Sequence, residues 1–137
     1  MPETLPQENK ALLLEGFDVL FNQRDFEAAK RYWSPNYIQH SSHISPGREG
    51  LFNLVRELPP GMKYENDVII AEADYVMAHG RYTRPDEPNW VVVDVMRMKD
   101  GTFEEHWDVI QDEATKEQSK SGLPMFGGEF PKEIEFG

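Results

Sequence analysis

Residues 90–111 read WVVVDVMRMKDGTFEEHWDVIQ and are the most informative part of the chain. Residues 91–95 are β-branched and apolar except for Asp94, and the dipeptide Asp100-Gly101 that follows is a strong hairpin signal. The returning segment carries three further candidates in succession, His106, Trp107 and Asp108. A carboxylate inside an apolar strand is costly unless it has a partner or a task. The stretch therefore predicts a hairpin that carries chemically active side chains.

The length of the turn determines which side chains of this hairpin share a face. A two-residue loop at 100–101 would place Asp94 on one face and Asp108 on the other, because side chains alternate along a strand. A three-residue loop at 99–101 would be a type I turn with its glycine in the left-handed conformation. That loop would pair Asp94 with His106. We predict this second loop, because the final glycine suits it, and it puts on one face Val92, Asp94, Met96, Glu104, His106, Asp108 and Ile110.

The size and composition of the chain restrict its class. With 137 residues, we expect a single domain, 1–137, with a core from about residue 7 to residue 126 and a tail at 127–137. The net charge of −11, from 25 acidic and 14 basic residues, argues against nucleic-acid and membrane partners. The chain has no cysteine, which excludes disulfide and thiolate chemistry. No apolar run approaches the roughly 20 residues of a membrane span, and the N-terminus lacks signal-peptide features, so we expect a cytoplasmic protein.

Helical patterns occupy the first half of the chain and strand patterns the second. Apolar spacing predicts three helices, at 5–22, 26–33 and 48–58, with a short strand at 37–40 between the last two. Strands are predicted at 63–73 and 75–83, before the hairpin. This order indicates an α+β fold. We expect a cone-shaped, curved antiparallel sheet with the N-terminal helices packed on its concave face, enclosing a pocket.

Asp94 and Asp108 are the leading candidates for catalysis. If both carboxylates face one apolar pocket, burial raises their pKa values and mutual repulsion separates them. The pair would then supply one acid and one base near neutral pH. The alternative is that each carboxylate is exposed to solvent or paired with an arginine, such as Arg81 or Arg97.

Three of the four histidines also fall in predicted strands, namely His40, His79 and His106. A single strand histidine is usually a packed or rim residue, but three in one small sheet favour a shared pocket. We therefore include all three among the candidate catalytic residues. Histidine and carboxylate suit zinc or iron, but no pair here has the spacing of a zinc motif, so no metal site is predicted.

Other residues are candidates for binding a substrate. Tyr37, Gln39 and Tyr82 are able to donate hydrogen bonds to a substrate oxygen, although ordinary strand packing explains each of them separately. Three apolar side chains are expected to line the pocket, namely Met96, Trp90 and Phe126.

Several of these segments together resemble a known family. The segments YIQH (37–40), PGREG (46–50) and EHWDVIQ (105–111), with the strand around Asp94 and the Asp100-Gly101 turn, resemble the SnoaL-like polyketide cyclase family. The resemblance covers roughly Leu12 to Phe126. It implies the cone-shaped α+β fold that this family shares with nuclear transport factor two, ketosteroid isomerase and scytalone dehydratase.

The resemblance also carries expectations about chemistry. Cyclases of this family close a ring by intramolecular aldol condensation without a cofactor, so none is expected here. Their general acid/base is an aspartate in the last long strand, which by motif position is Asp108. Their second polar residue is a histidine, and its strand position falls on Asp94, so the type of acid/base reaction stays open. His40 and His79 are expected to face the interior.

Three functions are compatible with the sequence. The first is a cofactor-independent acid/base enzyme acting on a small apolar carbonyl compound by aldol-type cyclisation, isomerisation or dehydration. The second is a hydrolase of the limonene-epoxide type, which needs two aspartates and an inward-facing Arg81 around a water molecule. The third is a non-catalytic ligand-binding module. Relatives commonly dimerise through the outer sheet face, so we expect a homodimer through Arg97, Trp107 and Val109.

Overall fold

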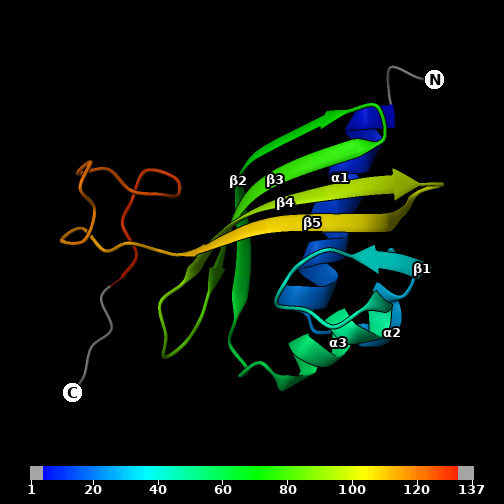
Figure 1. Ribbon diagram of the computed structural model, residues 1–137, viewed down its shortest axis with the longest axis horizontal. Helices are drawn as coiled ribbons and strands as arrows, with labels where there is room; N and C mark the ends of the chain where they lie inside the picture. The colour runs from blue at the N-terminus through cyan, green and yellow to red at the C-terminus, as the bar shows by residue number, and fades with distance from the viewer. Residues whose placement is uncertain (1–4, 133–137) are drawn as a thin grey trace.

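The computed structural model describes residues 5–132, which form a curved five-stranded sheet with helices against one face (Figure 1). The strand order is β1-β5-β4-β3-β2. In chain order the elements are α1 (Leu5–Phe17), the π-helix η1 (Asp18–Asn22), α2 (Phe26–Ala29), β1 (Trp33–Gln39), α3 (Gly47–Glu57), β2 (Lys63–Glu72), β3 (Tyr75–Thr83), β4 (Trp90–Lys99) and β5 (Thr102–Asp112). The predicted α+β class is confirmed. Of the predicted tail, residues 133–137 lie outside the described residues.

The first helix is fixed to the sheet by its last residue. The helix predicted at 5–22 is present, but its final turn widens into η1. There the Asn22 side chain accepts a hydrogen bond from the backbone N–H of Tyr64 (2.7 Å) and donates one to the Tyr64 carbonyl (3.1 Å). Asn22 thus pairs with both backbone polar groups of Tyr64 in β2, where the helix meets the sheet. Asp25 caps α2 by accepting a hydrogen bond from the Ala28 N–H.

Aromatic side chains fill the space between helices and sheet. Phe17 of α1 stacks on Trp33 and meets Phe103 edge to face, with ring centroids 6.0 and 6.1 Å apart. Trp33 also meets Phe103 at 4.7 Å. These rings are almost completely buried, and such edge-to-face pairs stabilise beyond the area they bury. The aromatic cluster fixes how α1 crosses the strands, and it forms one end of the cavity described below.

The hairpin between β4 and β5 differs from the predicted one. Lys99 pairs with Thr102, so the loop has two residues, and Asp100 and Gly101 both have positive φ, as a type I′ turn requires. The predicted three-residue loop is therefore wrong. The register shifts between Arg97 and Met98, which leaves Glu104 as an extra, unpaired residue, a β-bulge.

The bulge restores the arrangement that a two-residue loop would have destroyed. Beyond it Asp94 pairs with Asp108, rather than with His106 as predicted, and Met96 pairs with His106. The predicted inner face is retained, except that Glu104 does not line the cavity and Phe103 turns inward. Asp94, His106 and Asp108 therefore still share one face of the sheet.

Strand β1 is the exception in an otherwise antiparallel sheet, because it runs parallel to β5. It begins at Trp33, earlier than predicted, and Gln39 is level with His106. Just past its end, the His40 N–H donates to the His106 carbonyl at 2.9 Å. This pairing brings the side chains of β1 beside those of β5, although the two segments are about 70 residues apart in sequence.

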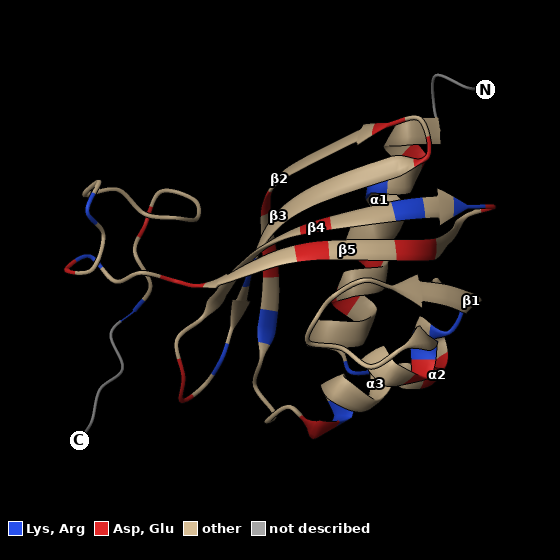
Figure 2. Cartoon of the chain, in the orientation of Figure 1, with Lys and Arg blue, Asp and Glu red and all other residues tan. Residues whose placement is uncertain are grey.

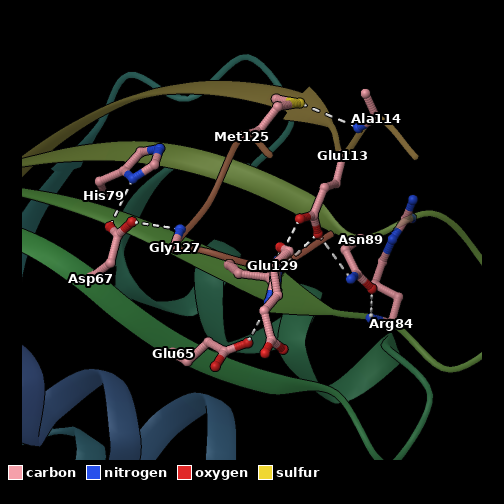
Figure 3. A network of polar contacts seen from close by, with 11 residues as sticks. Glu65, Asp67, His79, Arg84, Asn89, Glu113, Ala114, Met125, Gly127 and Glu129 are labelled. Atoms are coloured by element: carbon pink, nitrogen blue, oxygen red, sulfur yellow. Dashed lines mark hydrogen bonds and ion pairs between the residues drawn. The ribbon is translucent and has the colours of Figure 1, made fainter. Parts of the chain in front are cut away.

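The segment after β5 folds back over the outer face of the sheet (Figure 3). Arg81 Nε donates to Glu113 Oε1 at 2.9 Å, and the Phe126 ring lies 4.6 Å from the Arg81 guanidinium carbon. The Gly127 N–H donates to Asp67, whose other oxygen meets the His79 ring at 2.7 Å. These contacts hold residues 113–129 against β2 and β3. Within residues 5–132, no helix is both long and apolar enough to cross a membrane.

Candidate functional site

The helices and the inner face of the sheet enclose a cavity of about 290 Å³. Its wall is mostly apolar. The apolar side chains come from α1, η1, β1, the segment that follows β1, α3, the segment between α3 and β2, β4 and β5, namely Phe17, Phe21, Trp33, Ile44, Leu51, Leu54, Leu58, Met62, Trp90, Val92, Met96 and Ile110. Six polar residues complete it, namely Tyr37, His43, Tyr82, Asp94, His106 and Asp108. A cavity of this kind buries a small apolar molecule and offers it a few polar contacts.

Asp94 is the most deeply buried charged group of the cavity, with 2% of its surface exposed. Its Oδ1 lies 2.7 Å from His106 Nε2, and its Oδ2 accepts a hydrogen bond from the Tyr82 hydroxyl at 2.9 Å. Burial and the charge of Asp94 raise the pKa of Tyr82 well above its usual value, so this hydroxyl stays protonated and donates. Both oxygens of Asp94 are thus engaged by the protein itself.

Gln39 fixes the other side of the His106 ring. Its Oε1 accepts from the Ser41 backbone N–H at 3.0 Å, which determines the orientation of the amide. The same oxygen lies 2.7 Å from His106 Nδ1, so Nδ1 carries a hydrogen and donates it. His106 is therefore held between an amide oxygen and a carboxylate.

Asp108 is the carboxylate that faces the cavity without such partners. Figure 2 shows acidic segments side by side on β4 and β5, where Asp94 and Asp108 pair. Burial raises the pKa of Asp108 above its usual value and the charge of Asp94 adds to this, whereas His106 and the Ser41 hydroxyl act in the opposite direction. Asp108 is half-buried, so it is accessible to a bound molecule. It is therefore a somewhat stronger base than an ordinary aspartate.

The structure brings together seven of the eleven residues that the sequence suggested. Asp94, His106 and Asp108 face the cavity, with Tyr37, Tyr82, Met96 and Trp90 in its wall. Gln39 is beside the cavity and reaches it through His106.

The expectation that His40, His79 and Phe126 face the cavity is wrong. His40 lies on the outer face, where it stacks flat on Trp107 at 4.8 Å and meets Glu105 at 2.7 Å. His79 is also on the outer face, with Phe126 packed 5.6 Å from its ring. Because side chains alternate along a strand, the inward positions of Ala78 and Gly80 turn His79 outward.

Arg81 is outside the cavity as well. It makes two hydrogen bonds to Glu113, whose side chain is completely buried, and a third to Glu65. The limonene-epoxide type of site needs this arginine between the two aspartates. The structure therefore overturns that alternative for Asp94, Asp108 and Arg81.

The site includes residues that were not anticipated, among them Trp33 and His43 in the cavity wall and Ser41 beside Asp108. His43 lines the cavity, and its charge stabilises the ionised form of Asp108. Both Ser41 and His43 follow β1 directly, so its pairing with β5 places them beside Asp108. Their position just after Gln39 could have suggested that they belong to the site. However, the sequence of an edge strand does not reveal which strand it pairs with, so their proximity to Asp108 could not be predicted.

The same carboxylates and imidazole also have suitable spacing for a metal ion. One ligand atom each from Asp94, His106 and Asp108 lie within 4.8 Å of one another. However, Asp94 and His106 contact each other directly at 2.7 Å, so an ion would have to displace this contact. The donor set fits an acid/base cluster without rearrangement, and it fits a metal only with rearrangement.

Comparison with known proteins places these features in context. A sequence model of the SnoaL-like domain matches residues 14–106. No curated protein matches the chain. Among solved structures, the chain is similar to a candidate ketosteroid isomerase from Kribbella flavida, with a TM-score of 0.72, 17% identity and coverage of 92% of this chain and 97% of that one.

Two further solved structures have the same fold. AclR, a candidate hydroxylase from Streptomyces galilaeus, has a TM-score of 0.65 and 27% identity, with coverage of 77% of this chain and 80% of that one. A candidate polyketide cyclase from Acidithiobacillus ferrooxidans has a TM-score of 0.68 and 17% identity, with coverage of 76% and 88%. These similarities confirm the expected fold. Proteins with this fold have been assigned several different activities, so the fold alone does not identify a reaction.

Proposed function

Because the chain belongs to the SnoaL-like domain family, we propose that it is a cofactor-independent acid/base enzyme acting on a small, largely apolar carbonyl compound. The observation that carries the proposal is the position of Asp108, a half-buried carboxylate with a raised pKa in the wall of an apolar cavity. Beside it, Asp94 and His106 form a pair that the protein already satisfies. Asp108 is thus the group left to exchange a proton with a ligand.

In this mechanism, Asp108 removes a proton from the carbon next to the carbonyl group. The electron pair of the broken C–H bond moves onto the carbonyl oxygen and gives an enolate. Protonated Asp108 then returns the proton to a carbon in an isomerisation or to the leaving oxygen in a dehydration. In an aldol-type cyclisation the enolate carbon first bonds to a second carbonyl carbon of the same molecule, and the proton goes to the alkoxide that this forms. Isomerisation, aldol-type cyclisation and dehydration all begin with this step, so the proposal extends to each of them.

The proposal predicts exchange of carbon-bound hydrogen with solvent. We expect the protein to accelerate incorporation of deuterium from D₂O next to the carbonyl of bicyclic ketones such as α-tetralone, followed by NMR. Only ionised Asp108 acts as the base, and burial raises its pKa above the usual 3.8. The exchange rate should therefore rise with pH through that raised pKa and then level off. Exchange no faster than in buffer, across a panel of such ketones, would contradict the proposal.

We further propose that two copies of the chain associate through the outer face of the sheet. Strand register aligns two rows of side chains across this face, namely Ile70–Met77–Val95–Trp107 and Val68–His79–Val93–Val109. Several of them are strongly exposed, and Val109 has 73% of its surface accessible. An apolar patch of this extent on a chain with a net charge of −11 is typical of an interface.

A single charge placed in these rows should separate the copies. We expect sedimentation to give a dimer mass for the wild-type protein at micromolar concentration and a monomer mass for Val109→Glu. Leu123→Glu is the matched control, because Leu123 is 68% exposed but lies in the segment after β5, outside the two rows. A monomeric wild-type protein, or equal masses for both variants, would show that this face does not mediate association.

A further inference from the structure

The hydrogen bonds around His106 leave one hydroxyl of the cavity without an acceptor. Gln39 Oε1 receives two donors, the Ser41 backbone N–H and His106 Nδ1–H. Gln39 Nε2 donates to the Tyr37 oxygen at 2.9 Å. The Tyr37 oxygen is therefore an acceptor in this arrangement, and no residue within 5–132 accepts the hydrogen of its hydroxyl. Tyr37 is buried in the cavity wall, so this hydrogen has the cavity to point into.

Trp33 lies beside Tyr37 in the same wall. Its indole nitrogen is itself buried, so its N–H does not reach a molecule in the cavity. The indole is close enough to Tyr37 to favour the ionised hydroxyl, as Gln39 also does. Burial and the charge of Asp94 nevertheless outweigh both and raise the pKa of Tyr37 far above its usual value. Tyr37 therefore remains a protonated donor.

Two other donors near Asp94 are occupied. The Tyr82 hydroxyl donates to Asp94, and the His106 ring lies between Asp94 and Gln39. A buried hydroxyl is normally paired, so the free hydrogen of Tyr37 in the cavity wall requires an explanation. We propose that the Tyr37 hydroxyl binds an acceptor oxygen of the ligand, and that Gln39 is the positioning residue that holds Tyr37 in the donor role.

This subsite specifies the kind of oxygen. A carbonyl oxygen accepts hydrogen bonds and carries no hydrogen, which matches a hydroxyl that donates and whose own oxygen is already occupied. An alcohol would add a hydrogen of its own next to an oxygen of Tyr37 that already accepts from Gln39. The subsite should therefore prefer a ketone to the corresponding alcohol or hydrocarbon. Where that oxygen belongs to the carbonyl group activated by Asp108, the inference rests on the proposed function, and the Tyr37 hydroxyl would also stabilise the enolate.

The test measures binding and not turnover. Dissociation constants for α-tetralone, its alcohol α-tetralol and its hydrocarbon analogue tetralin are measured by tryptophan fluorescence for the wild-type protein, Tyr37→Phe and Tyr64→Phe. We expect Tyr37→Phe to reduce the preference for ketone over hydrocarbon by about 3- to 10-fold, as for one net hydrogen bond. Tyr64→Phe is the matched control, since its hydroxyl is also buried and unpaired but does not line the cavity. It should leave the preference unchanged.

Equal ketone preference in the wild-type protein and Tyr37→Phe, or no binding of the ketone, would overturn the proposal. Ketone selectivity without deuterium exchange would instead retain the subsite and reject the proposed base.

Discussion

Replacing Asp108 by asparagine is expected to lower the rate of deuterium exchange by about 100- to 10,000-fold, the range for loss of a general base. Asparagine has nearly the same shape, but its amide does not accept a proton at neutral pH. The rise of the rate with pH should disappear in the same variant, because Asp108 is the group that titrates. Ketone binding should persist, since the proposed oxygen subsite is formed by other residues.

The fold should survive this change, and the pKa of Asp108 gives the reason. Burial raises this pKa in the folded protein, so the unfolded chain releases the proton at a lower pH than the folded chain does. Stability therefore falls as the pH rises from the usual value of 3.8 through the raised one, and at neutral pH ionised Asp108 opposes folding. Asp108→Asn removes that cost, so its melting temperature at neutral pH should equal or exceed that of the wild-type protein.

A control on the same strand separates a local effect from a general loss of negative charge. Asp112 is exposed at the end of β5 and lies outside the cavity wall, so Asp112→Asn should exchange at the wild-type rate. Exchange in Asp108→Asn within about threefold of the wild-type rate, with the protein folded, would mean that Asp108 is not the base, since the expected loss is at least 100-fold.

Replacing Asp94 by alanine is expected to lower the free energy of unfolding by about 3–5 kcal/mol, the cost of removing one partner of a buried pair. The substitution leaves the Tyr82 hydroxyl and His106 Nε2 without their partner in a site that water hardly reaches. For a domain of this size, that loss corresponds to a fall in melting temperature of roughly 10 °C.

Asparagine at the same position provides the comparison. It fills the same volume, its oxygen still accepts from Tyr82, and its amide is able to donate to a neutral His106, so Asp94→Asn should lose only about 1 kcal/mol. Thermal or urea unfolding of both variants measures the difference. If Asp94→Ala were as stable as Asp94→Asn, the contacts of Asp94 with His106 and Tyr82 would not stabilise the fold as we infer.

The sequence was sufficient for the elements and for the inner face of the hairpin. Apolar spacing located the helices to within a few residues, although the second is shorter than predicted. The strands of the β2–β3 hairpin follow from alternation and turn signals. The right residues share the inner face, but the turn deduced for them was wrong. The extra residue of the bulge offsets the shorter turn, so the same side chains still face inward. The residue types alone reveal neither the turn length nor the bulge.

The histidines show where reasoning from residue types fails. His79 was expected inside because three histidines fall in predicted strands of one small sheet and because the family resemblance implies an interior position. The interior at that position has no room, since a Cβ on Gly80 would overlap the Tyr64 ring. Small residues therefore occupy the inward positions and His79 faces out. Gln39 and His40 were both assigned to the pocket, although neighbouring residues of one strand face opposite sides.

The β-bulge at Glu104 gives this hairpin something like a reading frame. Deleting Glu104 alone would exchange the two faces of β5 downstream, sending His106 and Asp108 to the surface and Trp107 into the cavity. A second single-residue change in the turn would restore the phase, as a compensating frameshift does in a gene. Among natural variants of this chain, length changes between Met98 and His106 should therefore occur in even numbers, or as pairs that cancel, wherever Asp94 and Asp108 still face each other.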